Sequence, residues 1–191
     1  MTVYKTSDMR RIVLMMMGLC LFMNMQAQTT ERAKQQVAEV RRQYAEARKM
    51  VEHSNLPHQD YYNDLTVKRR QMIGGPGQTF ETIRYFFESD YDEEVGGEVA
   101  QVYFITRSYN VAAMKHYEEF LFDATTAQLI FAFLQADEYD GTQSETRYYW
   151  GPEGLVHQVQ NGHSEVDDML TQRLAYDLVQ SFNLLVNRNY E

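Results

Sequence analysis

The 191-residue sequence contains a single cysteine, Cys20. It lies inside an apolar run near the N-terminus, so the remainder of the chain can form no disulfide, no thiolate metal site and no cysteine nucleophile. A chain without a disulfide must be held together by its core alone. Such a core is feasible, because a chain of this size buries about 68–70% of its unfolded surface.

Basic residues are also scarce, with 18 Lys and Arg against 27 Asp and Glu and a net charge of −9. This balance argues against nucleic acid, whose phosphates attract Lys and Arg, and against adsorption to an anionic membrane surface. Simple solubility is the commoner meaning of such a charge. We therefore expect no nucleic-acid partner.

The apolar run from Ile12 to Met23 has twelve residues, whereas a membrane-spanning helix needs about 20. It follows the basic residues Lys5, Arg10 and Arg11 and precedes Met25-Gln26-Ala27. This order indicates a cleaved signal peptide at residues 1–27 and a periplasmic or secreted mature protein, residues 28–191, that does not span the membrane. An uncleaved anchor and a lipidated Cys20 are the less favoured alternatives.

Motifs for metal, cofactor or nucleotide chemistry are missing. The histidines show no metalloprotease or zinc-ribbon spacing, and Val95 stands where a calcium loop starting at Asp90, Asp92 and Glu94 needs glycine. Residues 74–77 are Gly-rich but lack the Lys-Ser/Thr pair of a phosphate loop, and no Gly-x-Ser-x-Gly occurs. A surface metal site at His53, His58 and Asp60 remains an alternative to a plain polar connection. We expect no metal and no cofactor. A catalytic triad can assemble from residues far apart in sequence, but no motif here indicates one, so we expect no enzymatic activity.

Two helices are expected, one at each end of the mature chain. The first spans residues 30–53, and its apolar stripe consists of Ala33, Val37, Val40, Tyr44, Ala47 and Val51. We favour packing of this stripe on the protein's own sheet over a coiled-coil dimer. The second spans residues 165–187, with Ser164 as N-cap and Leu170, Leu174, Leu178, Phe182 and Leu185 as its stripe.

Between the helices, residues 65–160 alternate in the pattern of strands with short connections. We predict an α+β fold with a mostly antiparallel meander sheet of about seven strands. An acidic loop is expected from Asp90 to Glu98. The expected strands are 65–73, 79–88, 99–108, 114–122, 128–135, 145–150 and 155–160.

Residues 129–134 are apolar on both faces of their strand, so both sides of the sheet must be covered. In the strand 99–108, period-two alternation places Val102 and Phe104 on one face and Tyr103 and Ile105 on the other. Glu118 and Glu119 are adjacent in a strand and therefore point to opposite faces, where they cannot act together on one substrate. A curved or sandwiched sheet follows.

The signal ending Met25-Gln26-Ala27-Gln28 and the hairpin Arg147-Tyr148-Tyr149-Trp150-Gly151-Pro152-Glu153-Gly154-Leu155-Val156 resemble small uncharacterised secreted proteins of the Bacteroidetes type. The resemblance implies a periplasmic or exported location. It carries no catalytic residues.

Aromatic residues make up 13% of the chain. Most of them are expected in the core, because aromatic side chains pack well on the faces of a sheet. Part of the Tyr148-Tyr149-Trp150 segment faces away from the core if one side of its strand is exposed. The first functional hypothesis is an exported, noncatalytic module that binds a protein partner, a glycan or an apolar ligand through this surface. The second is a carrier of a hydrophobic small molecule between the sheet and the C-terminal helix, in a cavity lined by Phe104, Phe131, Phe133 and Phe182. A metal-dependent hydrolase is the third and least favoured.

Overall fold

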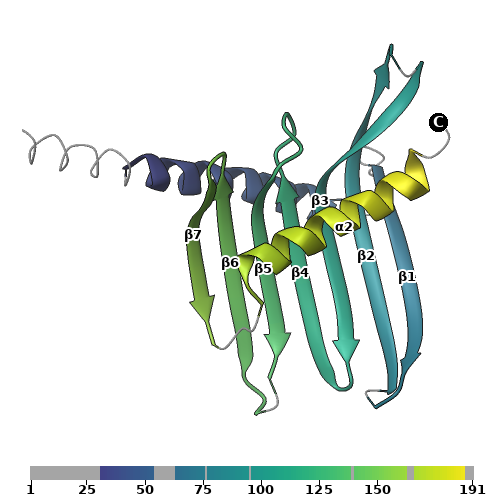
Figure 1. The fold of residues 1–191 in the computed structure, drawn as a ribbon, viewed down its shortest axis with the longest axis vertical. Helices are drawn as coiled ribbons and strands as arrows, with labels where there is room; N and C mark the ends of the chain where they lie inside the picture. The colour runs from purple at the N-terminus through teal and green to yellow at the C-terminus, as the bar shows by residue number, and fades with distance from the viewer. Residues whose placement is uncertain are drawn as a thin grey trace, which may run out of the picture.

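The computed structural model describes residues 31–53, 63–75, 77–94, 96–138, 140–162 and 166–187. Seven strands form one sheet in which each strand pairs antiparallel with its neighbour in sequence (Figure 1). The predicted α+β meander is therefore confirmed. Its strands are β1 (Asn63–Ile73), β2 (Gly77–Asp92), β3 (Gly97–Val111), β4 (Met114–Phe122), β5 (Leu129–Asp137), β6 (Gln143–Gly151) and β7 (Gly154–Asn161).

The acidic segment 90–98, expected as a loop, is instead the end of a long hairpin. β2 and β3 stay paired as far as Asp92 opposite Gly97. The amide of Gly96 donates to the Asp92 carbonyl oxygen at 2.8 Å, and the amide of Glu94 donates to the Asp92 carboxylate at 2.8 Å. The acidic side chain thus serves the turn, and the loop prediction was wrong because it considered charge and not this local hydrogen bonding.

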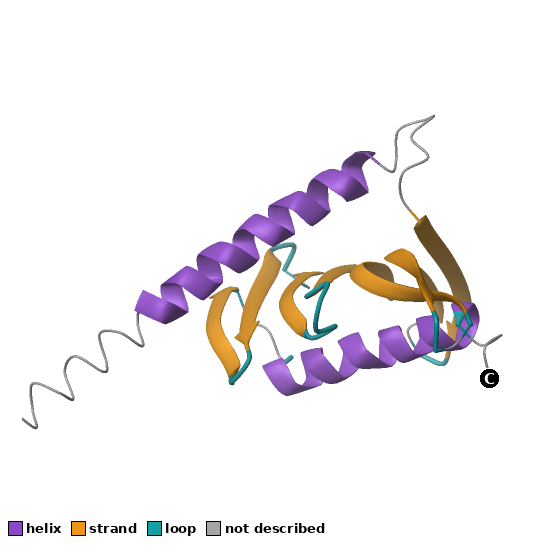
Figure 2. Cartoon of the chain, turned by 90° about the horizontal axis from the view of Figure 1, so that it is seen from above, coloured by secondary structure: helices purple, strands orange, loops and turns teal. Residues whose placement is uncertain are grey.

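The two helices cover opposite faces of the sheet (Figure 2). The N-terminal helix, described over residues 31–53, buries Val40, Ala47 and Val51 against the sheet, with Val37 and Tyr44 partly buried beside them. Packing on the protein's own sheet is therefore confirmed. Neither described helix combines the length and apolarity required to cross a membrane.

The C-terminal helix α2 (Asp168–Val186) corrects the predicted cap and stripe. Asp167 is the N-cap, and its carboxylate accepts from the Leu170 amide at 2.7 Å, whereas Ser164 lies outside the described residues. Leu170 and Leu185 are 54% and 61% exposed. Steps of four drift around a helix of 3.6 residues per turn, so the buried line alternates steps of four and three. It consists of Thr171, Ala175, Leu178 and Phe182.

The strand residues divide into two cores, one under each helix. Ala132 is wholly buried on the α2 side and Phe131 is 2% exposed on the other, which confirms that this strand is covered on both faces. The α2-side core also contains Tyr85, Ile105, Phe120, Tyr148 and Trp150, and the core under the N-terminal helix contains Phe86, Phe104, Leu121 and Tyr149.

Register shifts interrupt three of the strand pairs, β2–β3, β4–β5 and β6–β7. The residues passed over in the pairing are Tyr103, Ile130 and Val156. Extra residues of this kind bend and twist a sheet, and Figure 2 shows it curved between the helices. They also break the period-two alternation, so Val102 lies with Ile105 in the α2-side core and Phe104 lies on the other face, contrary to the prediction.

Candidate binding surface

The aromatic residues singled out by the sequence lie in the cores. Phe133 is the exception, being partly buried beneath the Arg147 guanidinium, 4.9 Å from its ring centroid. These side chains stabilise the fold and form no exposed aromatic patch on the sheet. The other six are at most 4% exposed, namely Phe104, Phe131, Tyr148, Tyr149, Trp150 and Phe182.

The four phenylalanines expected around one hydrophobic cavity lie on two sides of the sheet. Phe104, Phe131 and Phe133 face the N-terminal helix. Phe182 belongs to the α2-side core, where its ring lies 5.4 Å from Tyr85 and 5.0 Å from Phe87 between centroids. Because the sheet separates them, the four side chains cannot line a single cavity.

Glu119 is a buried carboxylate beneath the N-terminal helix, 1% exposed. It pairs with Arg48 and accepts hydrogen bonds from the hydroxyls of Tyr44 and Tyr117. Burial, reinforced by the charge of Glu119, raises the pKa of both tyrosines above its ordinary value. The carboxylate is therefore fully occupied in pinning the helix to β4.

Glu118 is held in the same way on the α2 side, which confirms that the two neighbouring glutamates face apart. Its carboxylate lies 2.9 Å from Nη1 of Arg107 and accepts from the Tyr109 hydroxyl at 3.0 Å. Arg107 also pairs with the buried Glu81 at 2.7 Å, and Glu81 forms a second ion pair with Arg69 at 2.7 Å. Each buried charge here has a partner, as a structural ion network requires.

The histidines form no shared site among the described residues. His53 is exposed on the N-terminal helix, His116 stacks on Tyr109, and His157 lies against Tyr149. His58, Asp60 and His163 lie outside the described residues. No group of three or more His, Cys, Asp or Glu side chains in the described part of the chain is arranged to hold a metal ion.

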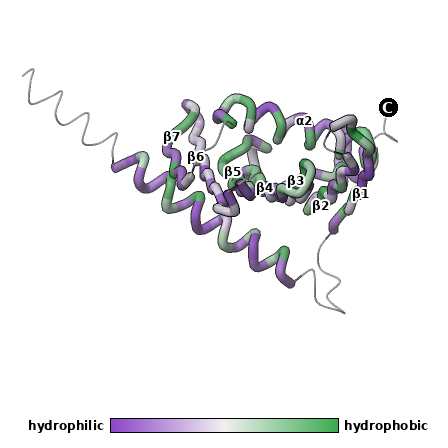
Figure 3. Tube along the Cα trace, turned by 90° about the horizontal axis from the view of Figure 1, so that it is seen from below, coloured by the Kyte–Doolittle hydropathy of each residue, from purple (hydrophilic) through white to green (hydrophobic). Residues whose placement is uncertain are grey.

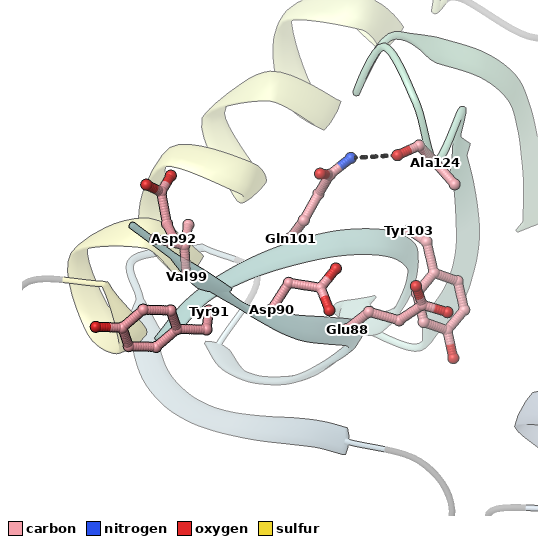
Figure 4. A pocket seen from close by; sticks show the side chains of 8 residues that line it. All are labelled: Glu88, Asp90, Tyr91, Asp92, Val99, Gln101, Tyr103 and Ala124. Atoms are coloured by element: carbon pink, nitrogen blue, oxygen red, sulfur yellow. Dashed lines mark hydrogen bonds between the residues drawn. The ribbon is translucent and has the colours of Figure 1, made fainter. Parts of the chain in front are cut away.

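An acidic hollow of about 330 Å³ lies at the projecting end of β2 and β3 (Figure 4). Glu88, Asp90 and Asp92 alternate along β2, so they share one face of the strand. On the neighbouring strand β3, the Gln101 side chain donates to the Ala124 carbonyl oxygen at 2.9 Å. The hollow is acidic in a protein whose net charge is −9, so its charge does not distinguish a ligand.

The two edges of the sheet differ sharply in chemistry. β1 carries Asp64, Lys68, Arg69 and Arg70, and charges on an edge strand discourage pairing with another chain. β7 has the sequence GLVHQVQN, without a charged residue or a proline. From His157 to Asn161 it pairs regularly with β6, and within the described ranges its other side has no strand partner, so this edge is neutral and unpaired there.

The N-terminal helix extends past this edge, beyond β7 (Figures 1 and 3). Beneath the overhang lies a hollow of about 470 Å³. Its apolar lining comes from Ala33, Val37, Ala38 and Val156, and its polar lining from Lys34, Arg41 and His157. We call this the edge hollow.

A second groove, of about 440 Å³, lies on the other flank of the same helix. Its helical wall includes Gln35, Gln36, Glu39 and Gln43, and its floor comes from the β4–β5 and β6–β7 turns. The helix lies close to the β6–β7 turn at Gly151. A Cβ atom added there would come within 3.3 Å of Gln36 on the helix and within 2.9 Å of Val156 on β7. The two hollows thus flank the first half of one helix.

No family model, curated protein or solved structure matches this chain. The candidate surface therefore rests on the chain's own geometry. The edge strand β7, the overhang and the edge hollow lie together at one end of the sheet.

Sequence reasoning missed this surface although part of its signal was visible. Residues 155–160 were identified as a strand, and their lack of charge can be read directly from the sequence. That this strand ends the sheet depends on the pairing order, and that a helix overhangs it depends on tertiary packing. Neither property follows from a local pattern.

Proposed function

We propose that this chain is an exported, noncatalytic interaction module that accepts an extended segment of a partner protein as an additional strand on β7. The observation that carries the proposal is the contrast between the charged edge β1 and the neutral edge β7. An edge strand offers a row of backbone donors and acceptors, and proteins commonly protect an unused edge with charged side chains, proline, a bulge or a covering element. β7 has no such protection from its side chains.

The helix overhang supports the same function. An added strand needs one face covered if its apolar side chains are to leave water, and the N-terminal helix already extends to where such a strand would lie. Main-chain hydrogen bonds would provide affinity, and the edge hollow would provide specificity. The buried, fully paired carboxylates Glu118 and Glu119 are consistent with a noncatalytic role.

The test is a selection of short random peptides by display against the mature protein, followed by binding to edge variants. Gln158→Lys and Gln160→Lys introduce charge on exposed positions of β7. Together we expect them to weaken the selected peptides by at least about tenfold, which corresponds to ~1.4 kcal/mol. Amide hydrogen exchange of β7 should slow in the wild-type complex.

The matched control is Gln180→Lys, which makes the same substitution at an exposed position of α2. It should bind the peptides like the wild type. An empty selection, or peptides that bind the lysine variants of β7 as tightly as the control, would contradict strand addition. Concentration-dependent dimerisation that the β7 lysines abolish would instead make a second copy the occupant and overturn the choice of partner.

Export has a separate test. The segment Ile12 to Met23 with its basic start predicts cleavage before Gln28. The intact mass of protein recovered from the periplasm should lack residues 1–27. A protein that retains these residues would contradict the cleaved signal peptide.

A further inference from the structure

We infer that the strand received by β7 presents an apolar side chain together with a carboxylate to the edge hollow. This inference rests on the proposed strand addition and specifies the partner's chemistry. It follows from what lines the hollow and from what the lining lacks.

The apolar part of the lining continues a row that runs beneath the N-terminal helix. Tyr103, Ile130 and Val156 are the three residues passed over by the pairing in alternate strands. Tyr103 and Ile130 pack into the core under the helix, while Val156 lies at the sheet edge and borders the hollow. One further apolar side chain, supplied by an added strand, would extend this row beneath Val37 and Ala33.

The ionisable part of the lining is cationic. Lys34 and Arg41 supply its positive charge, and no Asp or Glu borders the edge hollow, in a chain with a net charge of −9. Glu31 pairs with Lys34 at 2.8 Å, but both side chains are about two-thirds exposed, at 67% and 65%, where ion pairs are weak. The local charge is thus opposite to that of the whole protein.

Arg41 is the central group of this cationic lining. Its guanidinium lies 5.5 Å from the Tyr149 ring centroid, and its Nε donates to the Tyr149 hydroxyl at 3.4 Å. It forms no ion pair with any of the described residues. A guanidinium has five donors in a fixed fork, so Arg41 is oriented by Tyr149 with donors left for a carboxylate.

A second copy of this chain supplies the wrong chemistry through its own edge. β7 contains no Asp or Glu, so pairing β7 with another β7 places no carboxylate of that strand opposite Arg41. An extended segment of a different protein, with an acidic and an apolar residue, fits the hollow better. The partner is therefore an acidic, apolar strand rather than another molecule of this protein.

The experiment compares synthetic variants of one selected peptide that carry Glu, Gln or Lys at the position that the selection enriches for acidic residues. For the wild-type protein we expect the Glu peptide to bind about tenfold more tightly than the Gln peptide, since hydrogen bonds to charged groups are the strong ones. The Lys peptide should bind most weakly. Added salt should reduce the preference for Glu.

Arg41→Gln should remove the preference for Glu over Gln, and Arg41→Lys should restore part of it. The matched control is Arg32→Gln, which removes the same charge from the same helix but borders the other groove. It should keep the full preference. Unfolding midpoints of all variants would show that each remains folded.

The outcomes separate this inference from the proposed function. Peptides that bind at β7 with equal affinity for Glu and Gln, or a preference that survives Arg41→Gln, would overturn the acidic partner and leave strand addition standing. Peptides insensitive to the β7 lysines would overturn strand addition itself. A selection that enriches no acidic residue would also contradict the inference.

Discussion

Two consecutive glutamates in β4 each anchor a different face of the sheet. Glu119 binds Arg48, Tyr44 and Tyr117 on the side of the N-terminal helix, and Glu118 binds groups on the α2 side. A buried carboxylate is tolerated only while its donors remain, because removing one partner leaves the other charge unpaired. The cost of mutation at these positions should therefore far exceed that of surface ion pairs.

Glu119→Gln should lower the free energy of unfolding by about 1.5–3 kcal/mol, the range for hydrogen bonds to charged groups. The matched control is Glu46→Gln, which breaks the exposed pair with Arg42 on the same helix and should cost less than about 0.5 kcal/mol. Urea denaturation of both variants measures the difference. Equal losses would mean that Glu119 does not pin the helix.

His116 makes stability depend on pH, because burial lowers the pKa of its imidazole. The unfolded chain, with a histidine pKa of about 6.5, takes up the proton first as the pH falls. The imidazole's contribution is therefore complete above about pH 6.5 and is lost as the pH drops through the lower folded pKa. The groups facing it are Tyr109, Glu118, Arg107, Asp137 and Glu138.

His116→Phe keeps a ring to stack on Tyr109 and removes the titrating group. Between about pH 7.5 and about pH 5, the melting temperature of the wild type should fall more than that of the variant. Thermal unfolding followed by circular dichroism at each pH tests this. Parallel curves would show that His116 does not contribute to the acid sensitivity.

At the scale of elements, α2 shows why an apolar stripe read from sequence needs the structure to orient it. Leu170 and Leu185 of the predicted stripe are exposed, whereas the small residues Thr171 and Ala175 are as fully buried as Phe182. Small side chains let a helix approach a sheet closely. Half of the buried line, Thr171 and Ala175, therefore carries only a weak apolar signal in the sequence.

Leu178→Ala should cost about 2–4 kcal/mol, because Leu178 is 7% exposed in the α2-side core. Leu185→Ala removes the same atoms from a side chain that is 61% exposed and should change stability by less than about 0.5 kcal/mol. Chemical denaturation compares the pair. A large loss from Leu185→Ala would restore the stripe predicted from the sequence.

For the whole molecule, one sheet shared by two cores implies that the cores unfold together. Trp150, the single tryptophan, reports on the α2 side, while Phe131 lies under the N-terminal helix. β5 and β6 contribute to both cores, so damage on one face must be felt on the other. Small single domains usually unfold in one cooperative step, and we expect the same of this one.

Phe131→Leu should lower the urea midpoint by the same amount whether Trp150 fluorescence or far-ultraviolet circular dichroism is followed. We expect a loss of about 1 kcal/mol for this change in core shape. A fluorescence midpoint that stays at the wild-type value while the circular dichroism midpoint falls would show that the two faces unfold independently.

The sequence alone determined the class of this fold, since period-two segments joined by short turns specify a meander and a doubly apolar strand demands cover on both faces. It also determined that Glu118 and Glu119 face apart, because adjacent residues of a strand point to opposite faces. Tertiary structure decided everything that depends on where the ladder slips and what ends the sheet. The register shifts placed Val102 and Phe104 on different faces, the pairing order made β7 an edge, and the packing of the N-terminal helix created the hollow beside it. These properties arise from contacts between distant segments, which no local periodicity encodes.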